Sequence, residues 1–96
     1  MHIVVTYDVN TESKEGRRRL RRVAKICQDY GQRVQLSVFE CTVDAMQTDA
    51  LLAALAKEID PELDSLRIYR LHGERSGAVH TLGRDDYRDF TAPLLA

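Results

Sequence analysis

The hydrophobic and polar positions in the first third of the chain predict a strand followed by a helix. Residues 3–9 are β-branched and aromatic, which is typical of a strand, and an acidic residue ends their apolar run. From about residue 14 to 30, apolar side chains recur every three or four positions, the spacing of a helix with one buried face. Ser13 or Thr11 can cap the start of this helix, and Gly31 can cap its end.

A strictly alternating stretch at residues 33–41 predicts a half-buried strand. In this pattern Phe39 lies on the polar face with Arg33 and Ser37, so we expect it to be exposed and to meet a partner or stack on a base. Packing in a dimer is the favoured role. The stretch can also bend into a second short strand at 38–43. The buried face is expected to hold Val34, Leu36 and Val38.

The rest of the chain predicts a second helix and two further strands. The helix begins at Asp44, with Gln47 at the capping-box distance, and Pro61 stops it. Residues 66–71 read as a strand, and residues 78–82 as a short final strand. The order β-α-β-β-α-β with an extra C-terminal strand predicts an α+β protein with the ferredoxin-like fold. Two helices then cover one face of an antiparallel sheet, and the other face is solvated or meets a partner.

The length and the charge distribution narrow the class of protein. A chain of 96 residues allows one domain, which we place at residues 1–83, followed by a C-terminal tail at 84–96. The formal net charge of −1 hides two blocks of opposite sign. Residues 14–25 hold seven basic side chains against one acidic, and residues 40–64 hold seven acidic against one basic. The neutral total is therefore compatible with a nucleic-acid partner.

Several classes of protein are excluded by what the sequence lacks. No apolar run approaches about 20 residues, so we expect no transmembrane helix and no membrane partner. The chain enters an apolar run at once, without the pattern of a signal peptide. Cys27 and Cys41 lack the spacing of a zinc site, and we expect them to be buried thiols in a reducing cytoplasm.

Asp8, near the end of the first predicted strand, is the sharpest candidate for chemistry. A side chain at this position can project from the sheet edge into a site. One carboxylate holds Mg²⁺ only weakly, because this ion keeps several waters and takes one or two carboxylates together with phosphate oxygens. A two-fold dimer would bring a second copy of Asp8 to the same ion. The alternative is that Asp8 is only a turn residue after a strand.

An arginine cluster on the first predicted helix is the second candidate. The arginines lie within residues 17–22, interrupted by Leu20, and such side chains bind phosphate through paired N–H donors. Acidic partners are nearly absent from the run, so this helix face is not neutralised locally. The pattern indicates contact with a nucleic acid or another polyanion, and its alternative is a solvated helix face.

Three stretches occur together in this chain: the strand at 3–9 with its Tyr-Asp pair, the basic stretch 17–25, and residues 30–40 with the pattern Arg-Val-Gln-Leu-Ser-Val-Phe-Glu. In this combination they resemble the second CRISPR-associated core protein family, the Cas-two family. The resemblance is close over residues 1–41. It implies a ferredoxin-like homodimer in which the C-terminal strand of one protomer, here around 78–82, extends the sheet of the other. The ending of the chain resembles the subtype found with type I-C systems.

The resemblance also implies an activity and its residues. Family members are described as metal-dependent endonucleases that act on single-stranded RNA or on double-stranded DNA. The catalytic pair would be Tyr7 and Asp8, with Asp8 as the metal ligand and one Mg²⁺ or Mn²⁺ shared between the two Asp8 of a dimer. The remaining residues that it implies are the phosphate-binding Arg19, Arg22 and Arg33, with Arg17 and Arg18 as candidates in an alignment shifted by one turn, and Ser37 and Phe39 near the dimer cleft.

Three functional hypotheses remain open at this point. The first is the endonuclease. The second is a structural adaptor in CRISPR adaptation, or spacer acquisition, in which the dimer bridges two dimers of the CRISPR integrase (Cas-one), carries the incoming DNA and does not need Asp8. The third is a toxin-type endoribonuclease of the virulence-associated D family, which shares the fold and a Tyr-Asp-like feature. Arginines that bind phosphate do not read the sugar, so the choice between RNA and DNA stays open.

Overall fold

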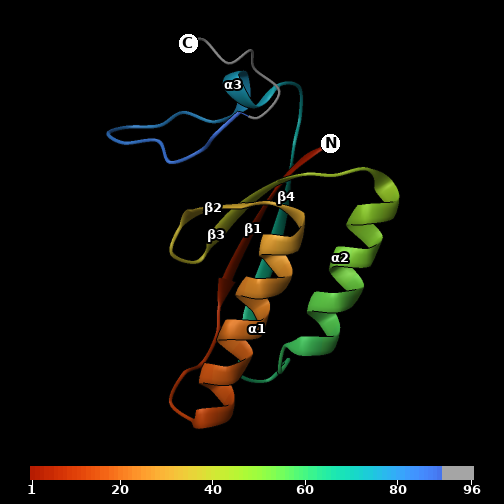
Figure 1. The fold of residues 1–96 in the computed structure, drawn as a ribbon, viewed down its shortest axis with the longest axis vertical. Helices are drawn as coiled ribbons and strands as arrows, with labels where there is room; N and C mark the ends of the chain where they lie inside the picture. The colour runs from red at the N-terminus through yellow and green to blue at the C-terminus, as the bar shows by residue number, and fades with distance from the viewer. Residues whose placement is uncertain (90–96) are drawn as a thin grey trace.

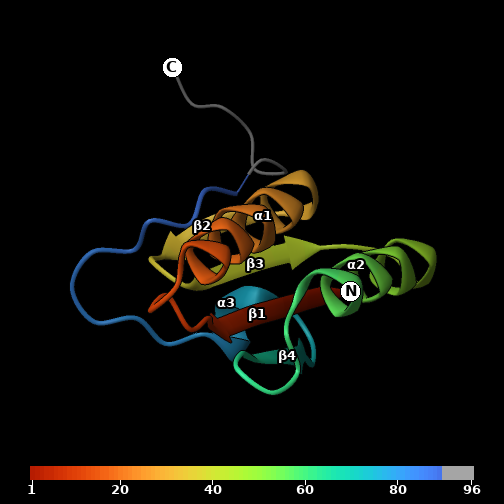
Figure 2. The ribbon, with the colours of Figure 1, turned by 90° about the horizontal axis from the view of Figure 1, so that it is seen from below.

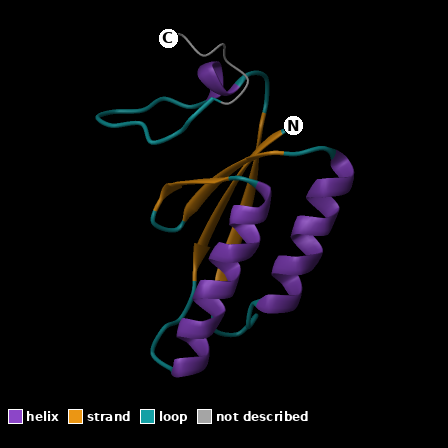
Figure 3. Cartoon of the chain, in the orientation of Figure 1, coloured by secondary structure: helices purple, strands orange, loops and turns teal. Residues whose placement is uncertain are grey.

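The computed structural model describes residues 1–89 and shows an antiparallel sheet with two long helices packed on one of its faces (Figures 1 and 2). The strands lie in the order β2-β3-β1-β4, so β1 is central and pairs with both β3 and β4. This arrangement confirms the predicted α+β, ferredoxin-like fold. The elements are β1 (His2–Asp8), α1 (Lys14–Tyr30), β2 (Gln32–Gln35), β3 (Val38–Thr42), α2 (Ala45–Glu58), β4 (Ser65–Leu71) and α3 (Arg75–Ala78), coloured by type in Figure 3.

Helix α1 has the bounds and the caps that the sequence predicts. At its start, the Ser13 hydroxyl accepts a hydrogen bond from the Gly16 N–H at 3.0 Å, and at its end the Gly31 N–H donates to the Cys27 carbonyl at 2.9 Å. Glycine is required at position 31 by close packing and not by its backbone conformation, because an extended backbone with a φ of −163° suits any residue. A Cβ there would overlap the Glu40 carbonyl oxygen and the Cys41 Sγ, so only glycine lets the helix end approach β3 this closely.

Helix α2 begins with the predicted capping box. The Asp44 carboxylate accepts from the Gln47 N–H at 2.7 Å, and the Gln47 side chain accepts from the Asp44 N–H at 2.9 Å. Leu51 and Leu55 are buried against the core. Within residues 1–89, no helix is both long and apolar enough to cross a bilayer.

The hairpin of β2 and β3 corrects the predicted single alternating strand and confirms the alternative of a second short strand at 38–43. The chain reverses at residues 36–37, and the register shifts between Arg33 and Gln35. Arg33 and Phe39 still share one face, as the alternation predicts, but this is the face that the helices cover. The prediction that Phe39 is exposed is wrong, because it is fully buried on the helix-covered face, whereas Leu36, predicted to be buried, is 84% exposed at the turn.

The final strand predicted at 78–82 is not formed in the described chain. Instead, α3 ends at Ala78 and a loop continues past the sheet to residue 89. A strand is stabilised by hydrogen bonds to a neighbouring strand, and this segment has no such neighbour among residues 1–89. The exchange of this strand in a dimer and the domain boundary at residue 83 stay predictions. The ending of the chain, from residue 90 on, lies outside the described residues.

Gly16 is where the first turn of α1 meets the loop that follows β1, and this contact predicts a stability effect. A Cβ at Gly16 would overlap the Asn10 carbonyl oxygen and lie 3.0 Å from its carbon, so the backbone would have to move. We expect Gly16→Ala to lower the free energy of unfolding by about 1–3 kcal/mol in urea titrations. The control is Gly77→Ala in α3, where a Cβ meets nothing within 4 Å. Equal stability of the two variants would contradict the prediction.

Candidate functional site

Asp8 lies at the end of β1, with its side chain on the sheet face that α1 and α2 leave uncovered, which we call the open face. The burial pattern of β1 alternates strictly, with Ile3, Val5 and Tyr7 buried toward the helices and Asp8 exposed. Its backbone partner is Ser65, the first residue of β4. In Figure 1, β1 ends on the side of the molecule where α1 begins. The carboxylate is therefore accessible and displayed by a central strand.

The structure does not bring Tyr7 and Asp8 together, since neighbouring strand residues point to opposite faces. Tyr7 is only 6% exposed and stacks on Phe39, with ring centroids 6.2 Å apart. Its hydroxyl is buried without a hydrogen-bond partner among residues 1–89. Tyr7 therefore anchors the end of β1 in the core, and its catalytic role stays a prediction.

Around this anchor lie Ser37 and Phe39, whose place near a dimer cleft stays a prediction, and Arg33, which is predicted to bind phosphate. The Tyr7 N–H donates to the Ser37 carbonyl at 3.1 Å, and the Arg33 guanidinium lies 5.2 Å from the centroid of the Phe39 ring. Arg33 thus makes a cation–π contact on the helix-covered side of the sheet. The cluster of Tyr7, Arg33, Ser37 and Phe39 joins the turn of the hairpin to the strand that carries Asp8.

Arg67 is a candidate that the sequence reasoning missed. Its register partner is Thr6, so Arg67 lies on the open face. Along this face the next pair is Asp8 with Ser65, two residues from Arg67 in β4. Its guanidinium donates to the Tyr69 hydroxyl at 3.1 Å and is otherwise exposed. The alternation of Leu66 and Ile68 with this arginine was the available signal, but only the pairing of β4 with β1 places it beside Asp8.

The loop that follows Asp8 is held by the buried carboxylate of Asp64. Its side chain is 0% exposed, and it accepts from the Asn10 N–H at 3.0 Å, the Arg19 Nε at 2.8 Å and the Asp60 N–H at 2.9 Å. Burial alone would raise the pKa of Asp64, but the hydrogen bonds from Arg19, Asp60 and Asn10 outweigh it and hold the pKa below its ordinary value.

The arginines of α1 fall into two groups. Arg19 is engaged with Asp64, and Arg17 donates to the Thr11 carbonyl at 3.2 Å. Arg22 has a long contact of 3.5 Å with Glu58 and remains half-exposed. In contrast, Arg18 and Arg21 are exposed and make no hydrogen bond or ion pair with residues 1–89. The outward face of α1 therefore offers Arg18, Arg21 and part of Arg22 to an anion.

The donor set for a divalent cation is incomplete in one chain. Residues 1–89 contain no group of three or more histidine, cysteine, aspartate or glutamate side chains that could hold a metal ion. Asp8 offers one accessible carboxylate, and Mg²⁺ takes one or two carboxylates with waters and phosphate oxygens. The residue therefore fits such an ion as one half of a site completed by a second copy or by a phosphate.

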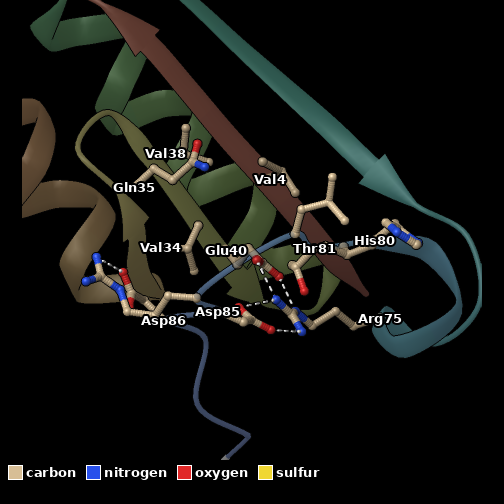
Figure 4. A pocket seen from close by; sticks show the side chains of 13 residues that line it. Val4, Val34, Gln35, Val38, Glu40, Arg75, His80, Thr81, Asp85 and Asp86 are labelled. Carbon is tan, nitrogen blue, oxygen red and sulfur yellow. Dashed lines mark hydrogen bonds and ion pairs between the residues drawn. The ribbon is translucent and has the colours of Figure 1, made fainter.

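A pocket of about 280 Å³ lies elsewhere on the open face, under the C-terminal loop, and Asp8 is not among its lining residues (Figure 4). Glu40, 5% exposed, accepts from Arg75 at 2.6 and 3.0 Å and contacts His2 Nε2 at 2.7 Å. Arg75 also donates to Asp85 at 3.3 and 3.2 Å. These ion pairs fasten the C-terminal loop to the sheet.

The two cysteines are buried and free, as the sequence predicts. Burial in the core raises the pKa of Cys27 to about 12 and that of Cys41 to about 11, because the charged thiolate loses its hydration there. Both groups therefore stay protonated, and neither serves as a nucleophile or as a thiolate ligand.

The fold and the strand order define the chain as an α+β protein of the ferredoxin-like class. Residues 1–79 match the family model of CRISPR associated protein Cas2, so the chain belongs to this family. The resemblance seen in the sequence is thereby confirmed, and it favours the CRISPR-associated hypotheses over the toxin-type alternative.

Individual relatives agree with this membership. The chain is 55% identical over 95 residues to a Chlorobaculum tepidum protein named CRISPR-associated endoribonuclease Cas2, with 99% of each chain covered. It is 50% identical over 95 residues to a Halalkalibacterium halodurans protein named CRISPR-associated endonuclease Cas2, again with 99% of each chain covered. The crystal structure of Streptococcus pyogenes Cas2 at pH 6.5 matches with a TM-score of 0.77 and 52% identity, covering 86% of this chain and 100% of that chain.

The lowered pKa of Asp64 predicts a pH dependence of stability. Because folding favours its ionised form, the carboxylate stabilises the fold above its unfolded pKa of about 3.9, and this contribution is lost as the pH falls through the folded pKa. We expect Asp64→Asn to flatten the fall of the unfolding free energy below about pH 5. Urea titrations at stepped pH measure this slope, with the exposed Asp49→Asn as control. A wild-type slope in Asp64→Asn would contradict the prediction.

Proposed function

We propose that this chain is a Mg²⁺- or Mn²⁺-dependent endonuclease that works as a homodimer, with one ion shared between two copies of Asp8. The observation that carries the proposal is the accessible Asp8 carboxylate on the open face, which could supply one of the one or two carboxylates that such an ion takes. Two-fold symmetry pairs identical surfaces, so an open face that meets its copy supplies the other half. The names of the relatives, endoribonuclease and endonuclease, support this class of reaction.

The chain's own residues divide the work at this site. When bound, a divalent cation supplies charge neutralisation and a more acidic water. Asp8 would hold it, and Arg67 is placed by register to donate hydrogen bonds to the phosphate oxygens of the same substrate. Thr6 and Ser65 complete the neighbourhood on the open face, and neither is a general base of suitable pKa. The substrate class is the phosphodiester backbone of single-stranded RNA or duplex DNA.

The first test removes the charge of the carboxylate. We expect Asp8→Asn to reduce metal-dependent cleavage of single-stranded RNA and of duplex DNA by about 100-fold or more, because the cation loses its protein ligand. Asp49→Asn, which neutralises an exposed carboxylate on α2, should cleave like the wild type. Undiminished cleavage by Asp8→Asn, or wild-type cleavage that persists in a chelator, would sink the proposal.

A second function is favoured by the separation of the two candidate features. The free arginines belong to α1, which lies on one side of the sheet (Figure 2), whereas Asp8 lies on the open face on the other side. Binding of a nucleic-acid backbone by these arginines therefore does not require Asp8. We propose that this basic face binds DNA without reading its sequence, as an adaptor in spacer acquisition that bridges dimers of the CRISPR integrase (Cas-one).

The second test separates binding from cleavage. We expect Arg18→Gln with Arg21→Gln to weaken duplex DNA binding, measured by fluorescence anisotropy over a range of salt concentrations. Loss of two phosphate contacts should reduce the slope of log K against log salt by about 1.8. Arg84→Gln, an exposed arginine outside α1 that pairs with Asp86, serves as control. An unchanged slope in the double variant would remove the basic face of α1 from the binding surface.

A further inference from the structure

We propose that Asp64 is a positioning residue for Asp8, fixing the strand end that presents this carboxylate to its ligand. The inference rests on the proposed function, because it concerns how the half-site of each protomer is held in place. Asp64 does not touch the ligand in this proposal. It acts through the backbone on either side of Asp8.

The first step of the argument is the number of segments that meet at one buried carboxylate. Asp64 Oδ1 accepts from the Asn10 N–H at 3.0 Å and from Arg19 Nη2 at 3.3 Å, and Oδ2 accepts from Arg19 Nε at 2.8 Å and from the Asp60 N–H at 2.9 Å. Both oxygens are fully used, and the side chain is inaccessible to solvent. A single group thus joins the loop after β1, helix α1 and the loop before β4.

The second step is the place of Asp8 within this arrangement. Asn10 follows Asp8 by two residues, and the intervening Val9 is buried in the core. On the neighbouring strand, the register partner of Asp8 is Ser65, which is covalently next to Asp64. Asp64 therefore restrains the backbone after Asp8 directly and the backbone opposite it through one peptide bond.

The third step concerns the other contacts of Asn10, which fix the loop between β1 and α1 independently of Asp64. The Asn10 side chain accepts from the Glu12 N–H at 3.0 Å, and the first turn of α1 packs so tightly against Asn10 that only glycine fits at Gly16. Removing the Asp64 acceptor leaves the Asn10 N–H and the Arg19 guanidinium without their buried partner. The loop directly after Asp8 would then become more mobile.

The fourth step concerns why the position of Asp8 matters. Among residues 1–89, Asp8 makes no side-chain hydrogen bond or ion pair, so the position of its backbone is the restraint that the protein places on the carboxylate. Mg²⁺ demands near-ideal octahedral geometry with ligands at about 2.0–2.1 Å, and small displacements of a ligand weaken binding. Residues that orient metal ligands contribute about 10–100-fold in metal affinity.

The same geometry gives Arg19 a role different from phosphate binding. Its guanidinium donates two hydrogen bonds to Asp64 and is only 15% exposed. In this proposal Arg19 belongs to the tether that holds the Asp8 loop, and phosphate contact falls to Arg18 and Arg21.

The test measures Mn²⁺ binding by electron paramagnetic resonance and the hydrogen exchange of the Asn10 amide. We expect Asp64→Asn to weaken Mn²⁺ binding about 10–100-fold and to speed exchange at Asn10. Arg19→Gln, which keeps the backbone hydrogen bonds to Asp64, should change both in the same direction but by less, and it serves if Asp64→Asn does not fold. Wild-type Mn²⁺ affinity in the folded variant overturns the proposal.

A stability-matched control separates positioning from a general loss of stability. Asp44→Ala removes the cap of α2 at the opposite end of β1, where the Val43 N–H donates to the Met1 carbonyl at 2.8 Å, and lowers the stability of the fold. It should leave Mn²⁺ affinity unchanged, and an equal loss in this control overturns the proposal. If the wild type binds no Mn²⁺ that Asp8→Asn removes, the proposed cation site fails and the positioning role with it. Binding equal in wild type and Asp64→Asn refutes the positioning role alone.

Discussion

Side chains of a strand alternate between two faces, and in β1 this rule governs nearly everything else in the molecule. Because β1 pairs with both β3 and β4, its alternate residues build the core under the helices and the surface of the open face at the same time. Tyr7 and Asp8 are neighbours in the chain but belong to different environments for this reason. One fixes the strand end by burial, and the other presents a charge.

The electrostatic organisation follows from where the two charge blocks meet. Helices α1 and α2 pack side by side, and the segment after α2 supplies Asp64 to a basic residue of α1. A buried pair of this kind pays a desolvation penalty, which hydrogen bonds to every available oxygen offset. The basic block is therefore only partly neutralised inside the protein. What remains unpaired, chiefly Arg18 and Arg21, faces solvent on the outward side of α1.

Local signals in the sequence were sufficient for the helices and their caps. Ser13, Gly31 and the Asp44–Gln47 box act within one helical turn, so their effect does not depend on distant parts of the chain. Phe39 shares a face with Arg33, as the alternation predicts, but the helices cover this face and not the face of Val34 and Val38. The pattern of hydrophobic residues alone does not reveal which face the helices cover.

Only part of the candidate site could be predicted from the sequence. The Tyr-Asp pair and the basic stretch could be found, because each is contiguous. Arg67 and Asp64 could not, since they approach Asp8 only through the register of β4 against β1 and through a hydrogen bond between residues 54 positions apart. Long-range pairing carries this information, and a single sequence does not display it.

The buried thiols have a practical meaning beyond their lack of chemistry. Cys27 and Cys41 lie between α1 and β3, at the centre of the core, and stay protonated while the protein is folded. Alkylation requires a thiolate that can reach and attack the reagent, so modification requires the helix to separate from the sheet. The rate of thiol labelling therefore reports how often the core opens, and no probe has to be added to the chain to measure it.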